Sequence, residues 1–311
     1  MIRQGSHLRA VVQALFVVFL WATSWVFIKV GLEEIPALTF AGLRYTLALI
    51  CLLPVVLLSR QLPSLRSISR PTWGRLLILG ILFYAVTQGA VFVALTYLPA
   101  VTVNLLWSFS NVTVALMGIV WLAERPTRFQ WLGIGLATLG AFIYFYPVAL
   151  PTSQLFGVLV AVCGVLANAG ASILGREVNR TGDIHPLVVT VISMGIGSIA
   201  LLAAGISIQG LPNISMRSWA IIAWLAVVNT AFAFTLWNHT LRTLSATESS
   251  IINGTMLIWI PVLAVVFLHE RVTAKEVFGL AVVVAGTLIV QSSRSDCAPS
   301  HRRCGRRPKT D

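Results

Sequence analysis

The most regular feature of the chain is an alternation of long apolar segments with short polar connectors. Each apolar segment has about twenty residues, the length that an α-helix needs to cross the hydrocarbon core of a bilayer. Ten such segments can be delimited, at residues 10–31, 36–59, 73–95, 99–122, 128–147, 154–176, 186–208, 218–241, 246–268 and 274–292. Because backbone groups in lipid must be paired within their own segment, and the segments lack strand-like alternation, we predict ten transmembrane helices.

Composition supports this membrane class. Of the 311 residues, 57% are hydrophobic and 10% are charged, and the mean hydropathy is +0.88. An ordinary soluble domain has about a quarter of charged residues. These values exclude a water-soluble enzyme, a disordered protein and a secreted disulfide scaffold, and they predict an all-α, multi-pass membrane protein.

The distribution of Lys and Arg predicts the orientation of the helices. Seventeen of the 22 basic residues fall in alternate connectors and in the tail, four fall in the opposite connectors, and Arg44 lies inside the second span. Since cytoplasmic loops are enriched in Lys and Arg, we expect both termini to be cytoplasmic. The net charge of +12 then indicates contact with anionic lipids, and no nucleic-acid partner is expected.

The end of the chain differs from the rest. Residues 294–311 are basic and polar, and we predict a disordered cytoplasmic tail. Cys297, His301 and Cys304 stand close together in this tail. Their spacing matches no established zinc pattern, so no metal and no cofactor is expected.

The two halves of the chain are related by a repeat. Shifting the sequence by 146 positions places the fourth and fifth spans on the ninth and tenth. The matched pairs include a Glu-Arg dipeptide and two glycines: Glu124-Arg125 with Glu270-Arg271, Gly133 with Gly279, and Gly140 with Gly286. We therefore predict repeats at residues 1–148 and 149–293, followed by the tail. Five spans per half is an odd number, so the second half must be inverted, which is typical of secondary transporters.

Several motifs also resemble a known family. The first span contains Trp21-Ala22-Thr23-Ser24-Trp25, the second contains Arg44-Tyr45, and each half ends with Glu-Arg and paired glycines. In these features, over residues 10–292, the chain resembles the EamA branch of the drug/metabolite transporter superfamily. The resemblance implies a ten-helix inverted-repeat carrier that moves small metabolites, often amino acids, usually outward across a prokaryotic inner membrane.

Polar and aromatic residues within the spans are the candidates for binding a substrate. In the fourth span, Asn104, Ser108 and Asn111 share one helical face beside Trp107, and Asn253 of the ninth span is repeat-related to Trp107. Buried polar groups at this depth usually face the bundle interior. The further candidates are Trp21, Ser24, Tyr84, Gln88, Asn168 and Asn229. The alternative is that these amides and hydroxyls join packed helices by hydrogen bonds.

Other intramembrane residues have structural interpretations. We read the four repeat-related glycines as sites of close helix packing, and the Glu-Arg dipeptides as helix caps and charge pairs at the membrane edge. Arg44 is interpreted as pairing with Glu33 or Glu34, with attraction of a substrate carboxylate as the alternative.

These residues favour a carrier over other classes. We expect a transporter of small metabolites, an exporter or facilitative exchanger of amino acids or related amphipathic solutes, acting as a monomer or homodimer. The alternatives are a nucleotide-sugar antiporter of the same superfamily and an intramembrane enzyme. The spans lack a deep carboxylate, so proton coupling would depend on His239 or Glu248 near the cytoplasmic face.

Overall fold

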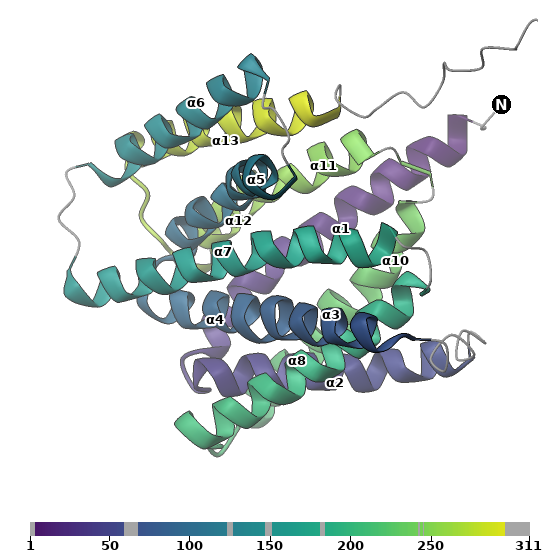
Figure 1. Ribbon diagram of the computed structural model, residues 1–311. Helices are drawn as coiled ribbons and strands as arrows, with labels where there is room; N and C mark the ends of the chain where they lie inside the picture. The colour runs from purple at the N-terminus through teal and green to yellow at the C-terminus, as the bar shows by residue number, and fades with distance from the viewer. Residues whose placement is uncertain are drawn as a thin grey trace, which may run out of the picture.

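The computed structural model describes residues 4–58, 68–122, 127–146, 151–180, 184–241, 243–244 and 246–295. Within these ranges the regular structure is helical and no strand is present (Figure 1). The cysteines and the histidine of the tail lie outside the described residues. The predicted all-α class is confirmed.

The helical elements follow the predicted apolar segments in order. They are α1 (Gln4–Gly31), α2 (Ala37–Leu58), α3 (Arg70–Gly80), η2 (Ile81–Thr87), α4 (Gln88–Tyr97), α5 (Ala100–Leu122), α6 (Arg128–Phe145), α7 (Thr152–Arg180), α8 (Pro186–Gln209), α9 (Met216–Ala226), η3 (Val227–Phe232), α10 (Ala233–Thr240), α11 (Ala246–Gly254), α12 (Met256–Leu268) and α13 (Ala274–Ser295). The third, eighth and ninth predicted segments each contain two or three consecutive elements.

Seven helical stretches of the described chain are long and apolar enough to cross a membrane. They are His7–Gly31, Ala37–Leu58, Arg70–Tyr97, Gln154–Asn179, Pro186–Gln209, Met216–Trp237 and Ile251–Leu268. The other three predicted spans correspond to α5, α6 and α13. The chain is thus a multi-pass membrane protein, and the number of ten crossings stays a prediction.

Repeat-related helices pack on one another. In Figure 1, α6 and α13 lie side by side at one end of the molecule, and α2 and α8 lie together at the other end. Between these two layers, α1 contacts α10 and α12, while α5 contacts α7 and α12. Each half therefore contributes to every layer, and the interior is formed by both repeats.

Glycines allow α6 and α13 to approach closely. A Cβ atom added at Gly140 would lie 2.6 Å from the backbone nitrogen of Val283 and 2.7 Å from the carbonyl oxygen of Gly279. An added Cβ at Gly286 would lie 2.6 Å from the carbonyl oxygen of Gly133. These distances are shorter than van der Waals contact, so the packing role predicted for the repeated glycines is confirmed.

Two π-helical turns, η2 and η3, interrupt repeat-related helices. Their first residues, Ile81 and Val227, are separated by the repeat offset. In each turn a threonine hydroxyl donates to the carbonyl oxygen five residues earlier: Thr87 to Leu82 at 2.7 Å and Thr230 to Leu225 at 2.9 Å. Single π-helical turns inside α-helices are frequent at functional sites. The middle of these two helices is therefore a candidate region for a functional site.

Charged side chains cap helix ends on the predicted outer side, and one of these contacts joins the two halves. The carboxylate of Glu270, after α12, accepts hydrogen bonds from the first backbone amides of α5, at Ala100 (2.6 Å) and Val101 (3.1 Å). Lys29 of α1 donates to the carbonyl oxygen of Leu98 at 2.7 Å, at the end of α4. These charges match the helix dipoles, so the capping role predicted for Glu270 is confirmed.

Candidate functional site

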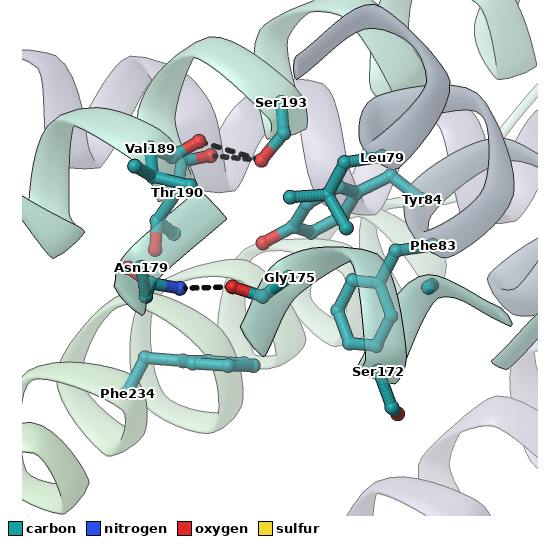
Figure 2. A pocket seen from close by; sticks show the side chains of 11 residues that line it. Leu79, Phe83, Tyr84, Ser172, Gly175, Asn179, Val189, Thr190, Ser193 and Phe234 are labelled. Atoms are coloured by element: carbon teal, nitrogen blue, oxygen red, sulfur yellow. Dashed lines mark hydrogen bonds between the residues drawn. The ribbon is translucent and has the colours of Figure 1, made fainter. Parts of the chain in front are cut away.

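A cavity of about 200 Å³ lies between α3, η2, α7 and α8, with one residue of α10 on its edge (Figure 2). It is lined by Leu79, Phe83, Tyr84, Ala171, Ser172, Gly175, Asn179, Val189, Thr190, Ser193 and Phe234. None of these lining residues carries a formal charge at neutral pH. The wall is apolar and aromatic with a few polar groups, which is the usual composition of a small-molecule site.

Most polar groups around the cavity are paired within their own helix. Ser193 donates to the carbonyl oxygen of Val189 at 2.6 Å, and the Asn179 amide donates to that of Gly175 at 2.8 Å (Figure 2). The hydroxyl of Thr190 donates to the preceding turn of α8 at 3.0 Å. These donors are therefore already used in this state.

Tyr84 is the exception among the polar lining residues. Its side chain is 3% exposed, and its hydroxyl has no hydrogen-bond partner in the described part of the chain. Figure 2 shows this hydroxyl pointing toward the side of the cavity formed by Gly175, Asn179 and Thr190. This hydroxyl is not among the fully enclosed unpaired polar atoms, so it is open to the cavity and can donate to a bound solute. The Tyr84 hydroxyl is thus the group best placed to bind a ligand atom.

A second layer of aromatic side chains supports the cavity. Phe234 lies 5.4 Å from Trp21, centre to centre, and Trp21 lies 5.2 Å from Trp237. The indole N–H of Trp21 is buried and has no partner among the described residues. The predicted candidate Trp21 is therefore one side chain away from the cavity.

Some predicted site residues bind neighbouring helices close to this region. Gln88 accepts a hydrogen bond from the Tyr45 hydroxyl at 2.7 Å. Asn229, in η3, donates to the carbonyl oxygen of Leu20 and to the Thr23 hydroxyl, so it ties η3 to α1. Ser24 is buried in α1 and lies 3.5 Å from the same Leu20 oxygen. Their role in binding a solute stays a prediction.

The polar face of the fourth span contacts other helices. Asn104 donates to the carbonyl oxygen of Leu257 in α12 at 3.5 Å, and Asn168 of α7 donates to Ser110 of α5 at 2.5 Å. Trp107 packs against Gly164 of α7. These contacts correspond to the interhelical alternative, and none of these residues lines the described cavity.

Two candidates of the fourth and ninth spans remain. The side chain of Asn111 lies outside the part of the structure that is described. Asn253 is exposed on α11. The structure therefore does not bring Asn253 together with Tyr84 at the cavity.

The two residues suggested for proton coupling are separate from the cavity. His239 is exposed in the last turn of α10. Glu248, in the first turn of α11, forms an ion-pair contact of 2.8 Å with His7 of α1. A role for either residue in coupling stays a prediction.

Several lining residues were not singled out in the sequence. Ser172 and Asn179 on α7, and Thr190 and Ser193 on α8, lie toward helix ends that face one another. Their spacings of seven and three residues place each pair on one helical face. That periodicity was available in the sequence, but hydroxyl and amide groups near span ends are common and gave no distinctive signal.

The structure corrects the interpretation of Arg44. Its side chain is 5% exposed, and its Nε and Nη2 atoms both lie 3.3 Å from the Thr230 hydroxyl oxygen in η3. Glu34 instead accepts hydrogen bonds from Ser215 and Ser218 at the start of α9. The expected pairing of Arg44 with Glu33 or Glu34 is therefore wrong, because Glu34 caps a helix of the other half.

Comparisons with known proteins agree with this architecture. Over 301 residues the chain is 28% identical to "Uncharacterized transporter YvbV" of Bacillus subtilis, covering 93% of this chain and 94% of the relative. It is 26% identical to "Uncharacterized inner membrane transporter YedA" of Escherichia coli, with 89% of each chain covered. It is also 26% identical to "Probable amino-acid metabolite efflux pump" of Salmonella typhimurium, covering 89% and 92%.

Structural and family comparisons extend over nearly the whole chain. A solved crystal structure with 16% sequence identity has a TM-score of 0.61 and covers 92% of this chain and 99% of that one, which shows a shared fold. The model of the EamA-like transporter family matches twice, at residues 8–146 and 155–292. The two matches correspond to the two halves seen in the sequence. The chain belongs to the EamA-like transporter family.

Proposed function

We propose that this protein is a secondary carrier that moves a small amphipathic organic solute, such as an amino acid or a related metabolite, by alternating access. The main support is the cavity of about 200 Å³ beside the π-helical turn η2. Its wall offers apolar and aromatic contacts, and the Tyr84 hydroxyl, which has no partner among the described residues, offers a donor. A cavity between two repeats is where carriers of this construction bind their substrate.

We further propose outward or exchange transport across a prokaryotic inner membrane, with both termini cytoplasmic. The names of two relatives support this proposal: "Uncharacterized inner membrane transporter YedA" and "Probable amino-acid metabolite efflux pump". The predicted cytoplasmic ends of α7 and α8 flank the cavity. A solute could therefore enter this state from the cytoplasm.

The alternative classes receive less support. A nucleotide-sugar antiporter needs cationic groups for the phosphates, and the residues that line the described cavity include no Lys or Arg. An intramembrane enzyme needs a nucleophile beside a general base, and the same lining residues include no His, Cys, Asp or Glu. The lining suits binding and release of a solute better than chemistry on it.

The proposal can be tested by filling the cavity. A side chain added at Gly175 first meets Leu79, 3.6 Å away, so Gly175→Leu should fold and occupy the cavity. Gly135 of α6 has no atom within 4 Å of an added Cβ, so Gly135→Leu is a matched control outside the cavity. A thermal-shift screen of amino acids, nucleosides and sugars would first find a solute that stabilises the purified protein. Counterflow of that solute in proteoliposomes should be lost in Gly175→Leu and retained in Gly135→Leu.

The coupling mechanism needs a separate measurement. We propose facilitative or exchange transport, because no carboxylate or histidine lines the described cavity. Proteoliposomes with equal solute on both sides and an imposed proton gradient should show no net accumulation. Accumulation that disappears in Glu248→Gln or His239→Ala would instead establish proton coupling.

A further inference from the structure

Arg44 carries a positive charge that no carboxylate in the described part of the chain balances. It lies two turns into α2 and is 5% exposed. Within the described residues, no Asp or Glu lies within ion-pair distance of it, and its hydrogen bonds go to the single hydroxyl of Thr230. Charged side chains at membrane depth are costly, and those that occur there usually pair or mark a substrate pathway. Arg44 is an intramembrane charge without an ion-pair partner among the described residues, so a role in the substrate pathway is the alternative to examine.

Aromatic rings are its other neighbours. The guanidinium carbon lies 5.1 Å from the centre of the Tyr45 ring and 6.0 Å from that of Phe92. Contacts of this kind stabilise a cation only in part and leave its net charge unchanged. The field of Arg44 therefore extends into the surrounding low-dielectric interior.

These rings connect Arg44 to the cavity. The Tyr45 ring lies 5.8 Å from the Tyr84 ring, in an edge contact, and Tyr84 lines the cavity. The Tyr45 hydroxyl is used by Gln88, whereas the Tyr84 hydroxyl is free among the described residues. Two aromatic side chains thus lie between the Arg44 cation and the cavity. Tyr84 is the one next to the cavity, and it carries the hydroxyl that has no partner among the described residues.

We propose that the cavity binds the carboxylate of its solute, with the Tyr84 hydroxyl as the direct donor and the charge of Arg44 as the source of anion preference. This inference rests on the proposed function, because it takes the cavity as the solute site. The apolar part of the solute packs on Leu79, Phe83 and Phe234. At about 10 Å and an effective dielectric constant of about 20, a unit charge favours an anion over a neutral isostere by about tenfold.

The test compares three probes with one carbon skeleton: 4-methylpentanoate, 4-methylpentanamide and 4-methylpentylamine. Their affinities for the purified full-length protein are measured at pH 7 by titration calorimetry. The carboxylate should bind about tenfold more tightly than the amide, and the amine most weakly. Equal affinity for the amide, or no binding of the carboxylate, would overturn the proposal without any variant.

Variants then assign the preference to Arg44. Arg44→Gln should reduce the carboxylate-to-amide ratio to near one, whereas Arg44→Lys should retain most of it. Thr230→Val removes the hydrogen bond and keeps the charge, so its carboxylate-to-amide ratio should stay close to that of the parent. This variant can be measured even if Arg44→Gln does not fold. A purely structural role of Arg44 would change stability and leave the ratio unaltered. A preference that persists in folded Arg44→Gln would overturn the assignment.

The cavity variant separates this inference from the proposed function. If Gly175→Leu abolishes probe binding but the parent protein does not distinguish the probes, the cavity remains the solute site and only the carboxylate assignment fails. If the probes bind equally well to Gly175→Leu and to the parent, the cavity is not the solute site. In that case the proposed function fails as well.

Discussion

Glu270 of the second half caps a helix of the first half, accepting a hydrogen bond of 2.6 Å from the backbone amide of Ala100. The contact fixes the turn after α12 against the start of α5. Because the first amides of a helix have no partner within it, a carboxylate at this position satisfies them and interacts favourably with the helix dipole. It also joins the two repeats at the predicted outer side.

The Glu270 cap should contribute measurably to stability. Glu270→Ala removes both hydrogen bonds to α5 and should lower the free energy of unfolding by about 1 kcal/mol. The thermal midpoint of the detergent-purified protein reports this loss. Glu33→Ala removes an exposed carboxylate near the same end and should have little effect. Equal midpoints for the two variants would contradict the capping role.

Gly140 should tolerate no side chain at the contact between α6 and α13. Gly140→Ala places a methyl group 2.6 Å from a backbone nitrogen, so the helices must separate, at a cost of about 1–3 kcal/mol. Gly135→Ala, on the same helix with open space around it, should be neutral or slightly stabilising. The amount of folded protein in the membrane and its thermal midpoint distinguish the two. Similar values for both variants would show that the close packing is unimportant.

Two candidate amides should differ in their effect on stability. Asn229 is fully buried and joins η3 to α1, so Asn229→Ala should destabilise the protein by about 1 kcal/mol. Asn253 is exposed, and Asn253→Ala should leave the thermal midpoint unchanged. If Asn253→Ala stops transport of an identified solute while preserving stability, the sequence-based assignment of Asn253 to the substrate path would be supported.

The contact of Glu34 with the start of α9 should make stability depend on pH. Hydrogen bonds from the Ser218 hydroxyl, then from the hydroxyl and amide of Ser215, lower the pKa of the Glu34 carboxyl below its ordinary value of 4.5. The carboxylate therefore stabilises the fold fully above that value, and the stabilisation is lost as the pH falls through the lowered pKa. The midpoint difference between the parent and Glu34→Gln should be largest at neutral pH and shrink on acidification below 4.5.

A control for this pH dependence is the exposed neighbour Glu33. Glu33→Gln should follow the parent protein across the same pH range. A difference between parent and Glu34→Gln that stays constant from pH 7 to pH 3 would contradict a lowered pKa for Glu34.

The orientation predicted from the basic residues can be measured by cysteine labelling. Asn213, exposed before α9, should react with a membrane-impermeant thiol reagent from outside, whereas position 64 should react only after the membrane is permeabilised. Asn213→Cys and Ser64→Cys are made in a background without the four native cysteines. Labelling of position 64 alone in intact cells would reverse the topology.

The sequence by itself determined the class of protein and its internal repeat. A membrane helix needs a continuous apolar segment of fixed length, and this requirement is written directly into the order of residues. The same holds for the offset of 146, which pairs α6 with α13 and the glycines between them. The length of an apolar segment and the spacing of a repeat are properties of the linear sequence. Both could therefore be recognised without knowing the fold.

Only the tertiary structure decided which polar residues meet. Tyr84 and Gln88 are four residues apart and both contact Tyr45 of α2, but only Tyr84 lines the cavity. Likewise, the partner of Arg44 proved to be Thr230 from the other half. Helical periodicity tells which residues share a face, but the packing of distant segments decides what that face contacts.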